Sequence, residues 1–319
     1  MKKMIKMLAV ILLAVSLPFV YVSAEDSAPV VRVGALKGPT GFALAHMMTE
    51  NDGSYAFTLA GAPTEITDLI IKGDLDAAAV PINLGAVLYN KTKGAVNALS
   101  LISGGMLYVL EKGDTIQTVA DLENKNIIAA GQGSTPEYVT NFILDTNGIN
   151  ASVEYKSEHA EVTTLAVSGL ADIILVPEPH VTNVMMKDPS FRIALDITDE
   201  FTAAAQKKGH DDVQLSMSMM IVRSEFLEKH PEQVKKLMAD LENSIAFALE
   251  NNEAAAQEIA AQGIIPAAAV AQKALPNCQL LFIHGEEMQS HATALYEILH
   301  SAKPASVGGK VPDEAFYLK

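Results

Sequence analysis

The chain has 319 residues, about the length of two ordinary domains, and carries 23 Lys and Arg against 38 Asp and Glu, a formal net charge of −15. Such an acidic balance argues against DNA or RNA as a partner, because nucleic-acid binding needs a basic patch. The single cysteine, Cys278, excludes an intramolecular disulfide and a cysteine-based metal cluster.

Residues 1–24 have the pattern of a cleavable signal peptide. Lys2, Lys3 and Lys6 precede an apolar stretch at 7–17, and small residues then lead to a cleavage site after Ala24. The stretch is short for a membrane helix, which needs about 20 residues, although an uncleaved anchor stays open as an alternative. No cysteine stands at the cleavage site to carry a lipid, so we expect a free protein, most simply in a periplasm.

Beyond this leader, apolar segments with strand character alternate with helical patterns, and they do so twice. The first series contains a glycine turn at 37–41, and the second contains one at 131–133, where Ser134 and Glu137 have the spacing of a capping box. The last third is mainly helical. Strands are predicted at 30–36, 55–60, 77–80, 126–130 and 216–223, and helices at 42–49, 64–72, 231–250, 253–262, 266–274 and 286–300.

An internal repeat connects the two series. Residues 64–83 and 160–179 align without a gap, and seven of their twenty positions are identical. Chance similarity between two helix–Gly–Asp–strand units is the alternative explanation. The repeat favours two α/β units of similar topology. In open α/β sheets, ligands bind beyond the carboxyl ends of the strands, so the strand-to-helix turns of both units should line one cleft.

Four motifs carry a family resemblance: VGALKGPTG (33–41), KGDLDAAAVPINLGAVLYNKT (72–92), AAGQGSTPEYV (129–139) and VPDEAFY (311–317). They resemble ABC-importer substrate-binding proteins of the nitrate/sulfonate/taurine and thiamin-precursor group. The resemblance implies an α/β, two-lobed type II periplasmic-binding-protein fold, with the ligand cleft between the lobes and a helical C-terminal third. We expect the first lobe to comprise 25–110 and 214–319, the second 111–213, and the chain to cross near 108–114 and 201–215.

The resemblance also implies a function. Such a receptor closes on a small solute and delivers it to membrane permease subunits, which are coupled to a cytoplasmic ATPase. We expect a monomer that has no cofactor and no nucleic-acid partner. No G-x-S-x-G, H-E-x-x-H or P-loop motif occurs, so we predict no catalytic residue and no enzyme. A binding module for a membrane sensor and an exported enzyme of related fold are the alternatives.

Solute-binding residues are predicted on the turns that match the family. Helix N-termini there favour an anion, whereas three glutamates, Glu137, Glu158 and Glu178, favour an amine. Arg32, Arg192 and Arg223 lie on no predicted cleft turn, which disfavours a tightly held sulfonate. We predict a small organic solute with amino or heteroaromatic nitrogen, with or without a sulfonate or carboxylate end. The predicted contacts are Gly38, Pro39, Thr40, Ile82, Asn83, Gly133, Ser134, Thr135, Glu158 and Glu178.

His159 and His180 stand beside two of these acids. Two histidines and two carboxylates could bind Zn²⁺. Their spacing matches no metal motif, so we predict no metal site.

Overall fold

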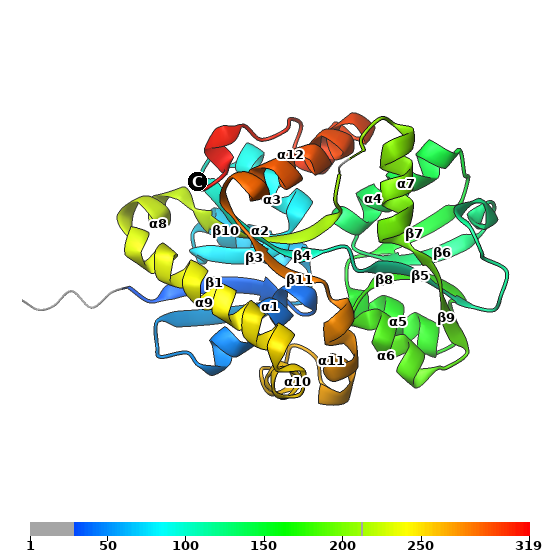
Figure 1. The fold of residues 1–319 in the computed structure, drawn as a ribbon, viewed down its shortest axis with the longest axis horizontal. Helices are drawn as coiled ribbons and strands as arrows, with labels where there is room; N and C mark the ends of the chain where they lie inside the picture. Colours follow the sequence, from blue (N-terminus) through cyan, green and yellow to red (C-terminus); the bar gives the residue numbers. More distant parts are fainter. Residues whose placement is uncertain (1–28, 212) are drawn as a thin grey trace, which may run out of the picture.

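The computed structural model describes residues 29–211 and 213–319. The predicted signal peptide at 1–24 lies outside the described residues. Figure 1 shows two lobes side by side, each built on one β-sheet, with the carboxyl-terminal helix α12 lying across the top. No helix in the described part of the chain is long and apolar enough to span a membrane.

The first lobe is built on a six-stranded sheet in the order β11-β4-β10-β3-β1-β2. β1 pairs in parallel with β2 and β3, whereas β10 pairs antiparallel with β3 and β4. Apart from Arg32, β1 and β3 are apolar on both faces because helices cover both sides of the sheet. The strands are β1 (Val31–Leu36), β2 (Tyr55–Ala60), β3 (Ala77–Pro81), β4 (Val96–Gly104), β10 (Ser216–Arg223) and β11 (Leu280–Ile283).

The second lobe is built on a five-stranded sheet in the order β7-β6-β8-β5-β9. β6 pairs in parallel with β7 and β8, and β5 lies antiparallel between β8 and β9. The strands are β5 (Leu107–Lys112), β6 (Asn126–Ala130), β7 (Ser152–Lys156), β8 (Ile173–Pro177) and β9 (Phe191–Asp196).

The internal repeat is visible in the strand order. β10-β3-β1-β2 in one sheet corresponds to β5-β8-β6-β7 in the other, with one antiparallel strand beside three parallel ones. The repeated helices α2 (Pro63–Lys72) and α5 (His159–Val167) hold equivalent places. Each is followed by a glycine with positive φ, 79° at Gly73 and 75° at Gly169, which lets the chain turn back into the next strand.

Helices form the rest of each lobe, and the predicted helical last third is confirmed. One short strand there, β11, was not predicted, because its four residues lie between helical segments and have no alternating pattern. The other helices are α1 (Pro39–Thr49), α3 (Ile82–Lys91), α4 (Thr135–Asn147), α6 (His180–Lys187), α7 (Ile197–Lys207), α8 (Ser224–Lys229), α9 (Pro231–Glu250), α10 (Asn252–Ala261), α11 (Ala268–Ala274) and α12 (Gly285–Ala302), with 3₁₀ turns η1 (Val119–Leu122), η2 (Leu275–Asn277), η3 (Pro304–Val307) and η4 (Glu314–Phe316).

The chain crosses between the lobes twice. The first crossing is short, because β4 ends at Gly104 and β5 begins at Leu107. It therefore lies a few residues before the predicted 108–114, and the predicted lobe boundary at 110/111 falls inside β5. The return passes from the end of α7 to Ser216 at the start of β10. Since Ser216 pairs with Gly104, the two crossings run side by side.

Candidate functional site

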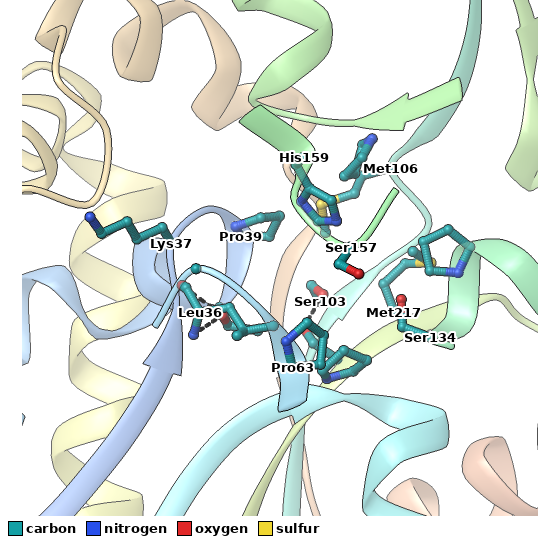
Figure 2. A pocket seen from close by; sticks show the side chains of 16 residues that line it. Leu36, Lys37, Pro39, Pro63, Ser103, Met106, Ser134, Ser157, His159 and Met217 are labelled. Atoms are coloured by element: carbon teal, nitrogen blue, oxygen red, sulfur yellow. Dashed lines mark hydrogen bonds between the residues drawn. The ribbon is translucent and has the colours of Figure 1, made fainter. Parts of the chain in front are cut away.

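A cavity with about 580 Å³ of empty space, open solvent at its mouth included, lies where the carboxyl ends of the parallel strands of both sheets meet (Figure 2). Both lobes and both crossings contribute to its walls, as the cleft prediction requires. The first lobe supplies Leu36, Lys37, Pro39, Thr40, Gly61, Pro63 and Pro81, the second supplies Ser134, Pro136, Ser157, His159 and Pro177, and the strand ends at the crossings supply Ser103, Met106, Met217 and Ser218.

The turn from β1 into α1 forms one wall. Gly38 has φ 122°, a region that favours glycine, and Pro39 then begins the helix. The Thr40 hydroxyl donates to the carbonyl of Leu36 and accepts from its N–H, both at 3.0 Å. The turn is therefore fixed by its own hydrogen bonds.

The turn from β6 into α4 forms the facing wall. The helix begins where predicted, but the reciprocal capping box is absent. Instead the Ser134 hydroxyl donates to the carbonyl of Gly131 at 2.7 Å, and the Glu137 carboxylate accepts from the N–H of Gly133 at 2.8 Å. The Ser134 hydroxyl thus stabilises the glycine turn that precedes it. The Glu137 carboxylate bonds to the same turn and does not line the cavity.

Two imidazoles lie side by side at the start of α5 and α6. The rings of His159 and His180 meet edge to face with centroids 5.3 Å apart, and His180 Nδ1 lies 3.0 Å from the Thr163 hydroxyl. Burial lowers the pKa of His159 to about 4. Burial, followed by repulsion from His159 and Lys187, lowers the pKa of His180 to about 3. Both side chains are therefore neutral near pH 7.

The cavity has little charge of its own. Figure 2 shows Ser157 and His159 turned toward the space between the lobes, whereas the Lys37 side chain extends away from it. No carboxylate belongs to the described residues that line the cavity. Gly38 and Glu158 line a wider opening that adjoins it, where the Glu158 carboxylate faces Gly61 of the first lobe.

Glu178 lies outside the cavity. It is buried, and its carboxylate accepts from the N–H of Thr182 at 3.0 Å and from the Thr182 hydroxyl at 2.9 Å. Burial raises the pKa of this carboxyl above its usual range. The position predicted from the repeat is thus a cap on the first turn of α6.

Four other predicted contacts also lie away from the lining. Ile82 is fully buried, and its carbonyl accepts a hydrogen bond from Tyr296 at 2.8 Å. The Thr135 hydroxyl donates to Asn83 Oδ1 at 3.1 Å, and the amide of Asn83 points to Gly133 O at 3.4 Å. Gly133 lines another opening, which adjoins the cavity at Pro63 and Ser157. Asn83 and Thr135 therefore join the lobes behind the cavity.

Sequence reasoning placed Pro39, Thr40 and Ser134 on the lining as solute contacts, and the turns that it expected to line the cleft also carry Lys37, Pro81, Pro136 and Pro177. It did not predict the residues at the crossings, which are Ser103, Met106, Met217 and Ser218. Met217 has no local signal of its place there, because the pattern of β10 does not show where the strand leaves the sheet.

A family model described as NMT1/THI5 like matches residues 96–255, half of the chain. The chain belongs to the NMT1/THI5-like family. This confirms the resemblance on which the sequence analysis relied. No curated protein sequence matches this family member.

Solved structures share the fold of this NMT1/THI5-like chain. An ABC transporter protein from Parabacteroides distasonis superposes with a TM-score of 0.74 at 21% identity, over 91% of this chain and 99% of that one. The sulphonate-binding protein SsuA from Escherichia coli has a TM-score of 0.70 at 15% identity, over 92% and 93%. The nitrate-binding protein NrtA from Synechocystis has 0.64 at 12%, over 88% and 84%. The predicted two-lobed binding-protein fold is confirmed, and these relatives are described as binding or transport proteins, not as enzymes.

Proposed function

We propose that this protein is the extracytoplasmic solute receptor of an ABC importer. The observation that carries the proposal is the cavity, which is lined by both lobes and by both crossings. A solute held there touches both walls, so it stabilises the closed arrangement by as much as its affinity for that arrangement exceeds its affinity for the open one. The permease can then distinguish the loaded receptor by its closed surface.

Three of the hydroxyl groups that line the cavity favour a solute with N–H donors. Thr40, Ser134 and Ser157 each already donate to a protein oxygen, at 3.0, 2.7 and 3.0 Å. A hydroxyl has one donor and two acceptor lone pairs, so the oxygens still able to bond are acceptors. An amino group or a ring N–H complements them, whereas the oxygens of nitrate or a sulfonate do not.

A neutral imidazole suits the same class of solute. In the described part of the chain, no group hydrogen-bonds to the ring of His159, which lies in the cavity wall. A neutral imidazole offers one donor and one acceptor, so it can pair either with a ring nitrogen or with an N–H group of the solute. The prolines of both walls add apolar surface that is rigid and can cover a flat ring.

The proposed solute is therefore a small organic molecule with amino or heteroaromatic nitrogen. A carboxylate or sulfonate end, where present, would lie toward Gly38 and Lys37 at the start of α1, because a helix N-terminus favours negative charge. We propose Pro39, Thr40, Ser134, Ser157 and His159 as contacts, with Gly38 and Glu158 at the mouth. Ile82, Asn83, Gly133, Thr135 and Glu178 are left out of the proposed site.

The wider assignment follows from the same role. We propose a monomer that works in the periplasm after cleavage at Ala24, with lobe boundaries near those predicted and with permease subunits and their ATPase as partners. This part of the proposal is supported by the family and by the binding-protein fold.

The test is thermal unfolding of residues 25–319, refolded to remove carried-over ligand, against a solute panel. The panel contains aminopyrimidines, thiamin, amino acids, polyamines, taurine, alkanesulfonates and nitrate. A solute at 100 times its Kd stabilises by about 2.7 kcal/mol, a shift of a few degrees for a chain of this size. We expect uncharged nitrogen heterocycles to give the largest shift. A shift with alkanesulfonates or nitrate alone contradicts the solute class, and no shift with any solute contradicts the receptor proposal.

Two serine-to-alanine variants test whether the solute binds in this cavity. Ser157 lines the cavity, whereas Ser168 is exposed at the end of α5 and its hydroxyl donates to the carbonyl of Leu165. We expect Ser157→Ala to weaken binding of the best solute by about 5- to 10-fold, the value of one hydrogen bond. Ser168→Ala should leave the affinity unchanged. Equal effects would move the solute out of this cavity.

A further inference from the structure

A cluster of side chains of the types that ligate metals lies on the first lobe, away from the cavity. His46 is in the last turn of α1, Glu50 follows one turn later, and Glu258 comes from α10. One donor atom from each can be chosen so that all three lie within 4.8 Å of one another. Both carboxylate oxygens of Glu258 lie 3.1 Å from His46 Nδ1.

The imidazole of the cluster is held in position. The ring of His46 stacks on Phe247 of α9, with centroids 3.7 Å apart and planes 6° from parallel. The His46 and Glu258 side chains are 23% and 16% exposed, and Glu50 is exposed. Two of the donors are thus fixed by the packing of three helices, while the open side lets water complete a coordination shell.

The local charge favours a cation. In residues 29–211 and 213–319, no lysine or arginine forms an ion pair with Glu50 or Glu258; the salt-bridge partner of Glu258 is His46. The carboxyl end of α1 adds partial negative charge at the same point. The carboxylates of Glu50 and Glu258 therefore lie near one imidazole, that of His46, and among the described residues neither is paired with a lysine or arginine.

We propose that His46, Glu50 and Glu258 bind a divalent transition metal, with Zn²⁺ the best match. Zn²⁺ is held at about 2.0–2.2 Å by histidine nitrogen and carboxylate oxygen, which puts two tetrahedral ligands roughly 3.3–3.6 Å apart. The 3.1 Å between His46 Nδ1 and Glu258 is a little shorter than that spacing. Ca²⁺ and Mg²⁺ prefer oxygen ligands alone.

A metal at this position would tie α1 to α10. The start of α1 forms a wall of the solute cavity, and the segment after α10 packs against it: a Cβ on Gly41 would lie 2.8 Å from Ile264. The bound metal stabilises the first lobe without entering the solute site. The proposal is independent of the proposed receptor function.

The test is calorimetric titration of the chain, purified without a polyhistidine tag and treated with a chelator, with ZnCl₂ alone. We expect one Zn²⁺ per chain, a rise of a few degrees in Tm at saturation, and no comparable effect of Ca²⁺ or Mg²⁺. Binding should weaken as the pH falls, because the ligands must be deprotonated. No Zn²⁺ binding by the wild-type chain overturns the proposal.

Variants locate the metal. His46→Phe keeps the stack on Phe247 and removes the nitrogen donors, and Glu258→Gln keeps the shape of the side chain. We expect each to weaken Zn²⁺ binding at least 10-fold. Glu253→Gln, at an exposed position of the same helix α10, is the control and should change nothing. If His46→Phe and Glu258→Gln both bind Zn²⁺ like the wild type, the metal binds elsewhere in the protein. Loss of Zn²⁺ binding in His159→Phe would then assign the metal to the histidine pair at the cavity.

Discussion

Replacing Thr135 by Val should loosen the contact between the lobes. Thr135 and Asn83 are both fully buried, on α4 of the second lobe and α3 of the first. The Thr135 hydroxyl donates to Asn83 Oδ1 at 3.1 Å, and the Asn83 amide donates to the carbonyl of Ser306 at 3.1 Å. Valine has the shape of threonine without the hydroxyl, so the substitution removes one hydrogen bond across the lobes and leaves Asn83 Oδ1 unpaired.

The size of the effect follows from that unpaired oxygen. A buried acceptor without a donor costs about 1–3 kcal/mol. Water reaches Asn83 once the lobes separate, so the cost falls on the closed arrangement alone. The lobe equilibrium should shift toward the open form by about 5- to 150-fold.

Two measurements detect the shift. If the free protein is mainly open, Thr135→Val should lower the solute affinity measured by calorimetry. If the free protein is mainly closed, Thr135→Val should raise the radius of gyration measured by small-angle scattering. Thr140→Val is the matched control, because Thr140 lies buried on the same helix and, among the described residues, its hydroxyl makes no hydrogen bond across the lobes. Its removal should be neutral or slightly stabilising. If Thr135→Val behaves like Thr140→Val in both measurements, the Asn83 contact does not hold the lobes together.

The remaining predictions concern Glu178 and the histidine pair. Glu178→Gln should lower the free energy of unfolding by about 1 kcal/mol, because the carboxylate caps α6, and should leave solute affinity unchanged; a large loss of affinity would return Glu178 to the site. His159 and His180, with pKa values of about 4 and 3, stay neutral in the fold while the unfolded chain takes up protons below their ordinary value of 6.5. Stability should therefore be fully present above that value and fall as the pH drops toward 4, with a shallower slope in the double variant His159→Phe/His180→Phe; an unchanged slope would contradict the burial of the rings.

The sequence was a good guide to the fold because the repeat couples two local patterns to one topology. Seven identities in residues 64–83 and 160–179 predicted equivalent βαβ units, and the two sheets have equivalent strand orders. The first crossing between the lobes lies a few residues before the predicted 108–114. β4 and β5 are separated only by Gly105 and Met106, and so short a break leaves no polar loop for a pattern to detect.

The site was harder to predict, because turns identify main-chain positions and not the direction of side chains. Glu178 stands at a strand end as predicted, yet its carboxylate turns back to Thr182. Asn83 was equally well placed in sequence, but its amide and carbonyl bond across the lobes behind the cavity. Ser103 and Met217 reach the cavity only because their strands lead into the crossings, a long-range fact that no local pattern contains.

The side-by-side crossings have a consequence for solute size. Gly104 and Ser216 are paired neighbours, and Ser103, Met106, Met217 and Ser218 at the same place form the base of the cavity. Two adjacent strands bend together about one axis, as a strip of sheet does, and resist independent twisting. A solute bound at the proposed site would rest on that strip, and its thickness would set the angle between the two walls. Molecules of equal affinity but unequal thickness would then leave the outer faces of the lobes at different angles, and a permease that reads those faces would transport one and reject the other.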